Sequence, residues 1–138
     1  MKLGLAIPQE LLTPDNFRFA RQAGCTQVFV GFGKITVETY PPEIPGAMER
    51  RVAYSQPNEA AWTYEGMCEM RDMINDAGLE WEAIQSFDVL HWYDVLLDGP
   101  RKGEQMDKLK TIIRDMGRVG IPTMGYNFSL AAVWGRQG

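Results

Sequence analysis

Three segments of the chain repeat one pattern, and this repetition constrains the fold more than any other feature of the sequence. In each segment a helical periodicity ends on a glycine, Gly24, Gly78 or Gly120, and an apolar run follows directly. Glycine adopts the left-handed backbone conformation that closes a helix without a Cβ clash, so the chain can turn at once into a strand. The pattern therefore predicts three joints between a helix and the next strand.

Capping residues and periodicity locate the helices before these joints. Thr13 and Pro14 are typical of a helix start and predict a first helix over about residues 14–23. A second helix is predicted after Thr63, and a third over about residues 103–119, each with apolar residues recurring on one face. Strands are then expected near residues 2–7, 27–32, 81–86 and 122–127.

Strands that alternate with helices favour a parallel sheet, because a parallel neighbour needs a crossover connection. A Rossmann sheet has the same alternation, but its first strand should run into a glycine-rich phosphate turn, and here Pro8-Gln9-Glu10 follows. A complete barrel usually needs about 200 residues or more. We therefore predict an α/β fold of the parallel (β/α) TIM-barrel type, present over residues 1–138 as a half barrel with four strands and three helices in one domain.

The connection over residues 34–61 is much longer than the others. It contains Pro41, Pro42, Pro45 and Pro57, too many prolines for a regular helix or a central strand. Loops that follow strands form the active-site rim in barrels of this type. This proline-rich loop is interpreted either as a lid or intersubunit arm, or as a variable surface insertion.

The composition excludes several classes of partner. A net charge of −4 without clustered lysine or arginine gives no electrostatic footprint for nucleic acid or an anionic membrane. The apolar run at residues 3–7 is shorter than the roughly 7–15 residues of a signal-peptide core, and no run approaches the roughly 18 residues of a membrane span. We expect a cytoplasmic protein in which Cys25 and Cys68 are buried structural thiols.

Candidate functional residues lie at the carboxyl ends of the predicted strands. His91 is the only histidine and follows the third strand; it suits proton transfer or metal binding, but a histidine among aromatic residues is also commonly a packing residue. Asn127 ends the fourth strand, where its amide suits a polyhydroxylated ligand or satisfies loop backbone. Arg136 follows and matches a carboxylate, or is solvated. Asp88 and Asp94 are interpreted as acids of a site or as local caps.

The ordered succession of several stretches resembles the mannonate dehydratase family. The stretches that carry this resemblance are 12–24, 91–100, 110–114, 120–121, 126–128 and 134–136. The resemblance implies a xylose-isomerase-like TIM barrel, a lyase of hexuronate and glucuronate catabolism that dehydrates D-mannonate to 2-keto-3-deoxy-D-gluconate with Mn²⁺ or Fe²⁺. In this family His, Cys and Asp residues from later strands hold the metal.

By this resemblance the chain corresponds to the amino-terminal half of the barrel only. It would then supply neither metal ligands nor catalytic residues, bind no metal by itself and be inactive alone, while His91, Asn127 and Arg136 bind the sugar acid. A homo-oligomer or a complementary barrel half is the expected protein partner. The alternatives are a stand-alone half-barrel with a binding or assembly role, and a related sugar isomerase or epimerase of the same superfamily.

Overall fold

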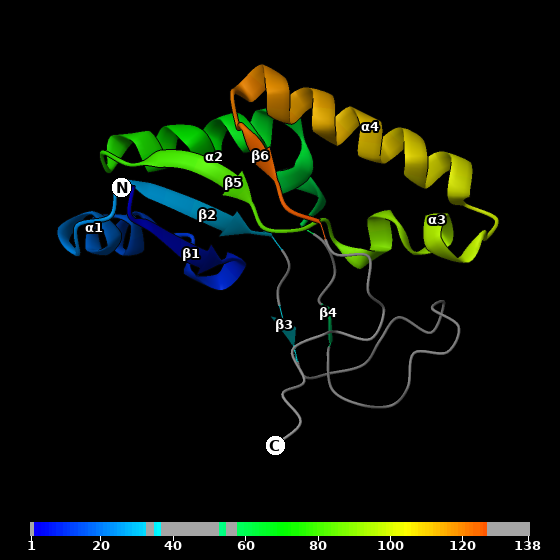
Figure 1. The fold of residues 1–138 in the computed structure, drawn as a ribbon, viewed down its shortest axis with the longest axis horizontal. Coiled ribbons are helices and arrows are strands. Elements are labelled where there is room, and N and C mark those ends of the chain that lie inside the picture. Colours follow the sequence, from blue (N-terminus) through cyan, green and yellow to red (C-terminus); the bar gives the residue numbers. More distant parts are fainter. Residues whose placement is uncertain (1, 33–34, 37–52, 55–57, 127–138) are drawn as a thin grey trace.

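The computed structural model of the chain describes residues 2–32, 35–36, 53–54 and 58–126. The strands and α-helices follow one another along these residues (Figure 1) as β1 (Gly4–Pro8), α1 (Pro14–Gln22), β2 (Gln27–Gly31), β3 (Ile35–Thr36), β4 (Ala53–Tyr54), α2 (Tyr64–Asp76), β5 (Glu80–Ile84), α3 (Tyr93–Leu97), α4 (Lys102–Val119) and β6 (Thr123–Met124). Short 3₁₀ helices lie between them: η1 (Gln9–Leu11), η2 (Glu59–Trp62) and η3 (Val89–His91).

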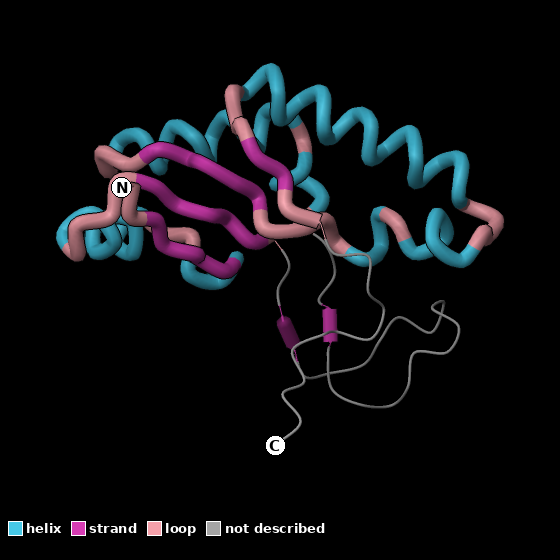
Figure 2. The backbone as a smooth tube through the Cα atoms, viewed as in Figure 1, coloured by secondary structure: helices cyan, strands magenta, loops and turns pink. Residues whose placement is uncertain are grey.

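Four parallel strands form the main sheet in the order β1-β2-β5-β6, as Figure 2 shows. Gly4 is paired with Gln27, Gln27 with Glu80, and Ala83 with Thr123. This arrangement confirms the predicted class of fold and the order of its strands. β6 is shorter than predicted, because only Ala83 and Ile84 of β5 pair with it.

Helices α1, α2 and α4 lie side by side along the sheet, with α2 in contact with both α1 and α4, and α3 lies beyond the strand ends (Figure 1). Their apolar stripes bury Phe17 of α1, Met67 of α2 and Met116 of α4, together with Val28 and Val30 of β2. Burial of apolar surface is the main favourable contribution to folding, so this layer forms the core. Within the described ranges, no helix is long and apolar enough to cross a membrane. Cys25 is a buried free thiol as predicted, and Cys68 is a partly buried one.

The predicted starts and ends of the helices are confirmed in detail. The side chain of Thr13 accepts a hydrogen bond from the backbone N–H of Asn16, and that of Thr63 accepts one from the N–H of Gly66. The three joint glycines, Gly24, Gly78 and Gly120, have φ of 91°, 74° and 90°. These angles lie in the left-handed region where a side chain is strained, so the repeated glycine has a conformational cause.

Replacing Gly120 by alanine is expected to lower the free energy of unfolding by about 1–2 kcal/mol, the cost of a left-handed alanine. Nothing lies within 4 Å of the added methyl group, so the loss would come from the backbone alone. Gly117 is the matched control, since it is an exposed glycine within α4 with equally open surroundings. Gly117→Ala should raise stability by about 0.5–1 kcal/mol. Urea unfolding measures the stability of both variants. A Gly120→Ala protein more stable than the parent would contradict the left-handed joint at Gly120.

Two parts of the structure were not predicted from the sequence. The short helix α3 is a fourth α-helix in the described part of the chain, and five residues are too few to show a periodicity. Within the predicted loop 34–61, β3 and β4 form an antiparallel pair, and η2 lies immediately before α2. The four prolines of that loop lie outside the described residues.

Candidate functional site at the carboxyl ends of the strands

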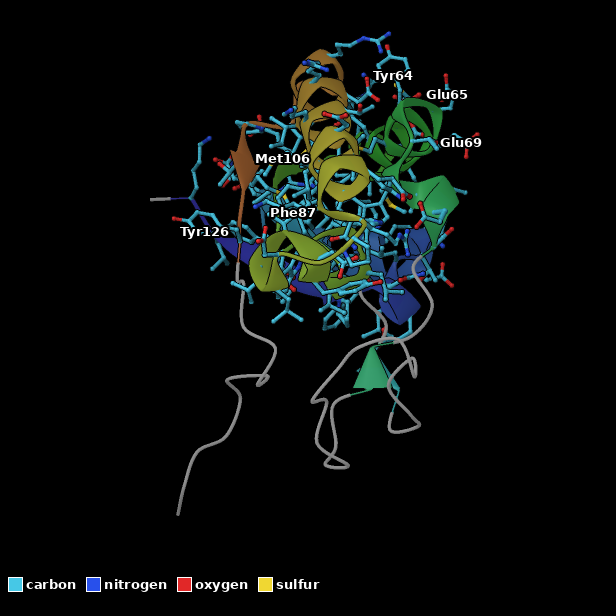
Figure 3. All side chains as sticks on the ribbon, turned by 90° about the vertical axis from the view of Figure 1, so that its right-hand side faces the viewer. Tyr64, Glu65, Glu69, Phe87, Met106 and Tyr126 are labelled. Atoms are coloured by element: carbon cyan, nitrogen blue, oxygen red, sulfur yellow. The ribbon has the colours of Figure 1, made fainter. Side chains whose placement is uncertain are left out.

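Aromatic rings from three separate segments pack together where the strands end. Phe32 follows β2, Trp62 ends η2 and Phe87 follows β5. The ring centroids of Trp62 and Phe32 lie 5.0 Å apart, and these two rings meet edge to face. The centroids of Trp62 and Phe87 lie 6.0 Å apart, and these two rings are nearly parallel. Figure 3 shows Phe87 amid the packed side chains, whereas Tyr64 and Glu65 lie at the outer edge of α2. The cluster attaches η2 to the strand ends.

Local sequence explains how η2 reaches this position. Thr63 caps α2 with its side chain and also donates a hydrogen bond from its hydroxyl to the carbonyl of Ala60 at 2.8 Å. Gly66 lies so close to the Ala60 carbonyl that a Cβ at this position would clash with it. A glycine in the first turn of α2 therefore permits the close approach of η2. This places Glu59 beside the strand-end cluster.

His91 lies at the end of η3 and is only 1% exposed. Its ring is edge to face with Trp62 at 5.1 Å, and its Nε2 lies 3.3 Å from Oε1 of Glu59. Lys108 of α4 contacts the other carboxylate oxygen of Glu59. The sequence therefore brings together an imidazole, a carboxylate and an ammonium from η3, η2 and α4.

The electrostatics of this group favour a neutral imidazole. Burial lowers the pKa of His91, and the positive charge of Lys108 lowers it further, against an opposing contribution from Glu59. Partial burial by itself would raise the pKa of Glu59, but hydrogen bonds from Lys108 and His91 lower it below its usual range. Near neutral pH the arrangement is thus a carboxylate between an ammonium and an uncharged ring.

Several buried polar atoms at the strand ends have no hydrogen-bond partner among the described residues. They are Nδ1 of His91, Oδ2 of Asp88, Nε1 of Trp62 and Oε1 of Gln9. Burial raises the pKa of Asp88, whose other oxygen accepts from the N–H of Leu90 at 2.9 Å. Because most buried polar atoms in proteins are paired, these atoms are candidates for hydrogen bonds to water, to a ligand or to another part of the complete protein.

Only some of the predicted site residues lie in the described part of the chain. His91 follows β5, as predicted, but it lies in η3, in contact with Glu59 and Trp62. Asn127 and Arg136 lie outside the described residues. Asp88 caps η3, since its side chain accepts from the N–H of Leu90, whereas Asp94 lies within α3 and accepts from the N–H of Arg101 at 3.0 Å. The cap interpretation is therefore confirmed for Asp88, while Asp94 instead joins α3 to the start of α4.

Sequence reasoning missed Glu59 and Lys108 as neighbours of His91. Glu59 falls within the predicted proline-rich loop of residues 34–61, and Lys108 falls within the third predicted helix. They are separated from each other by 49 residues, and Glu59 from His91 by 32. No local pattern signals such a pairing, and only the packing of α4 beside η3 and α2 creates it.

The described side chains do not offer a metal site. Across residues 2–32, 35–36, 53–54 and 58–126, no three His, Cys, Asp or Glu side chains gather closely enough to hold an ion. Protein sites for transition metals generally need at least about three such ligands.

Comparisons with known proteins agree on one family. A family model described as D-mannonate dehydratase (UxuA) matches residues 25–138. Mannonate dehydratase of Streptococcus pneumoniae (strain 70585) is 36% identical over 84 residues, which are 61% of this chain and 22% of the relative. The enzyme of Thermotoga maritima is 28% identical over 75 residues, 54% of this chain and 20% of the relative.

A solved structure shows the same fold. The crystal structure of mannonate dehydratase from Streptococcus suis serotype 2 superposes with a TM-score of 0.59 at 21% identity, covering 93% of this chain and 30% of that one. The described sheet and helices thus match part of a larger α/β barrel. The chain spans about a fifth of the length of the curated relatives that it matches, 22% for the streptococcal proteins.

Proposed function

The chain belongs to the D-mannonate dehydratase (UxuA) family, and from this premise we propose that it forms part of an enzyme that dehydrates D-mannonate to 2-keto-3-deoxy-D-gluconate. The observation that carries the proposal is the match of the family model over residues 25–138 together with the parallel four-stranded sheet. Because the chain spans 22% of the streptococcal relatives, the activity is proposed for the complete barrel. We place this lyase activity in the cytoplasm.

We propose that His91, Asn127 and Arg136 bind the sugar acid at the carboxyl ends of the strands. In barrels of this type the reacting groups lie at that face. Asn127 offers an amide to hydroxyl groups, and Arg136 offers a guanidinium that matches a carboxylate. The neutral ring of His91 would form a hydrogen bond with a hydroxyl group of the sugar acid. Mn²⁺ or Fe²⁺ would be held by other parts of the complete enzyme, since the described residues of this chain do not fit a metal.

A second candidate, a stand-alone half-barrel with an assembly role, is supported by the edges of the sheet. In the described sheet β1 and β6 each have a strand on one side only. Leu3, just before the edge strand β1, is 50% exposed, and Leu5, within that strand, is 36% exposed. Unpaired strand edges with apolar neighbours favour association with another copy or with a complementary half. A homo-oligomer or paired halves are therefore proposed as the assembly.

Turnover of D-mannonate by a complete barrel that contains this chain tests the first candidate. With added Mn²⁺, the complete barrel is expected to form the 2-keto acid. The variants His91→Ala, Asn127→Ala and Arg136→Ala should each lower kcat/KM by about 30-fold or more, because each loses one positioned hydrogen bond worth about 2 kcal/mol. Lys110, an exposed residue of α4 paired with Asp107, is the control, and Lys110→Ala should leave kcat/KM unchanged.

The outcomes separate the two candidates. The 138-residue chain alone should show no turnover, because its described residues hold no metal site. An inactive complete barrel, with the isolated chain forming a stable oligomer, would favour the assembly role instead. Unchanged kinetics in all three alanine variants would leave the family assignment in place and remove these side chains from the substrate site.

A further inference from the structure

We propose that Glu59 is a positioning residue that holds His91 in the neutral form protonated at Nε2, which leaves Nδ1 as a buried acceptor for a ligand hydroxyl. The ligand part of this inference rests on the proposed function, because it takes a sugar acid as the source of the hydroxyl. The assignment of the proton to Nε2 does not depend on it. It follows from the contacts of Glu59, His91, Lys108 and Trp62.

The contact between Glu59 and His91 determines which ring nitrogen carries the proton. Nε2 of His91 lies 3.3 Å from Oε1 of Glu59, and an ionised carboxylate can only accept hydrogen bonds. Nε2 must therefore donate. In a neutral imidazole the other nitrogen is then an acceptor, and the choice of tautomer is governed by the partner of the first nitrogen.

Lys108 completes the arrangement from the opposite side of Glu59. Its ammonium contacts Oε2 of Glu59, so each carboxylate oxygen has one donor. This contact keeps Glu59 ionised. The positive charge of Lys108 also disfavours the protonated, positively charged form of His91. The other acidic neighbour is Asp88, in the same turn as His91, whose buried Oδ2 is unpaired among the described residues. Glu59 and Lys108 are thus the charged groups that act on this ring.

The remaining nitrogen of His91 points to the chemistry of the ligand. Nδ1 is buried and receives no hydrogen bond from any described residue, although His91 is only 1% exposed. Trp62, whose ring is edge to face with His91, has a buried Nε1–H that likewise lacks an acceptor among those residues. A hydroxyl group both donates and accepts, so it suits either atom, as a donor to Nδ1 or as an acceptor from Nε1–H. A bound water or a sugar hydroxyl has this chemistry.

Nitrogen-15 NMR of the imidazole tests the tautomer directly, because His91 is the only histidine of the chain. The 138-residue chain would be labelled in histidine and measured in solution or, if it associates, by magic-angle spinning. At pH 7 we expect a neutral ring with the proton on Nε2, preferred by at least about tenfold, as one charge-assisted hydrogen bond implies. A proton on Nδ1, or a charged ring at pH 7, would overturn the proposal.

Variants separate positioning by Glu59 from a general effect of burial. Glu59→Leu and the milder Glu59→Gln should both reduce the preference for the tautomer protonated at Nε2. In the leucine variant, which lacks the hydrogen bond to Nε2, the populations of the two tautomers should differ by no more than about threefold. Glu59 is 55% exposed, so neither change removes a core side chain. Glu65→Leu is the matched control, an exposed glutamate of α2 seen at the outer edge in Figure 3. An unchanged spectrum in both Glu59 variants would contradict positioning by Glu59.

The ligand part is tested in the complete barrel with D-mannonate as the probe. The His91 signal, identified by its loss in His91→Ala, should shift at Nδ1 on titration with D-mannonate. A shift of the Nδ1 signal supports a sugar hydroxyl bound to Nδ1. If the enzyme turns over D-mannonate and the signal does not shift, that assignment is overturned in favour of water. If the tautomer is observed and turnover is absent, the proposed function fails while the positioning role of Glu59 stands.

Discussion

Replacing Trp62 by alanine is expected to lower the free energy of unfolding by about 3–5 kcal/mol, the usual range for removing a large aromatic side chain from a core. Trp62 is buried and contacts the rings of Phe32, Phe87 and His91, with centroids 5.0–6.0 Å apart. Alanine would leave a cavity between η2 and the strand ends. The loss would be measured by urea unfolding followed by circular dichroism.

Two further substitutions control for this result. Phe19 is an aromatic residue of α1 that is 63% exposed, so Phe19→Ala should change stability by less than about 0.5 kcal/mol. Trp62→Phe retains a ring in the cluster and should cost less than the alanine variant. A Trp62→Ala protein as stable as the parent would mean that η2 does not pack over the strand ends.

Gln105→Leu is expected to destabilise the chain by about 3 kcal/mol or more, because leucine fills the space but leaves buried backbone groups unpaired. Oε1 of Gln105 accepts from the N–H groups of Asp94 at 2.9 Å and Val95 at 3.3 Å. Nε2 donates to the carbonyl of Leu90 at 3.0 Å. One buried side chain of α4 thus fixes both the start of α3 and the turn before it.

The same substitution at an exposed position is the control for Gln105. Gln22→Leu, at the exposed end of α1, should change stability by less than about 0.5 kcal/mol. Hydrogen exchange adds a local measurement, since the amides of Asp94 and Val95 should exchange faster in Gln105→Leu than in the parent. Equal unfolding curves for the two leucine variants would contradict the role of Gln105.

The local conformation of the main elements was determined by the sequence alone. Gly24, Gly78 and Gly120 mark left-handed joints, and Thr13 and Thr63 mark helix starts, because these effects act within a few residues along the chain. Alternating strands and helices with such joints can be connected in few ways, and the parallel order β1-β2-β5-β6 is one of them. The lack of a glycine-rich turn after the first strand favoured a barrel over a Rossmann sheet, and the family resemblance implied the same barrel.

Only the tertiary structure decided the surroundings of His91 and the existence of α3. The imidazole, the carboxylate of Glu59 and the ammonium of Lys108 come from η3, η2 and α4, and neither spacing nor periodicity relates residues so far apart in sequence. The helix α3 is too short to have a periodicity and depends on hydrogen bonds to Gln105. Hydrogen bonds and ion pairs between distant segments depend on the apolar core that holds those segments together, because closing the intervening chain costs entropy that core burial offsets.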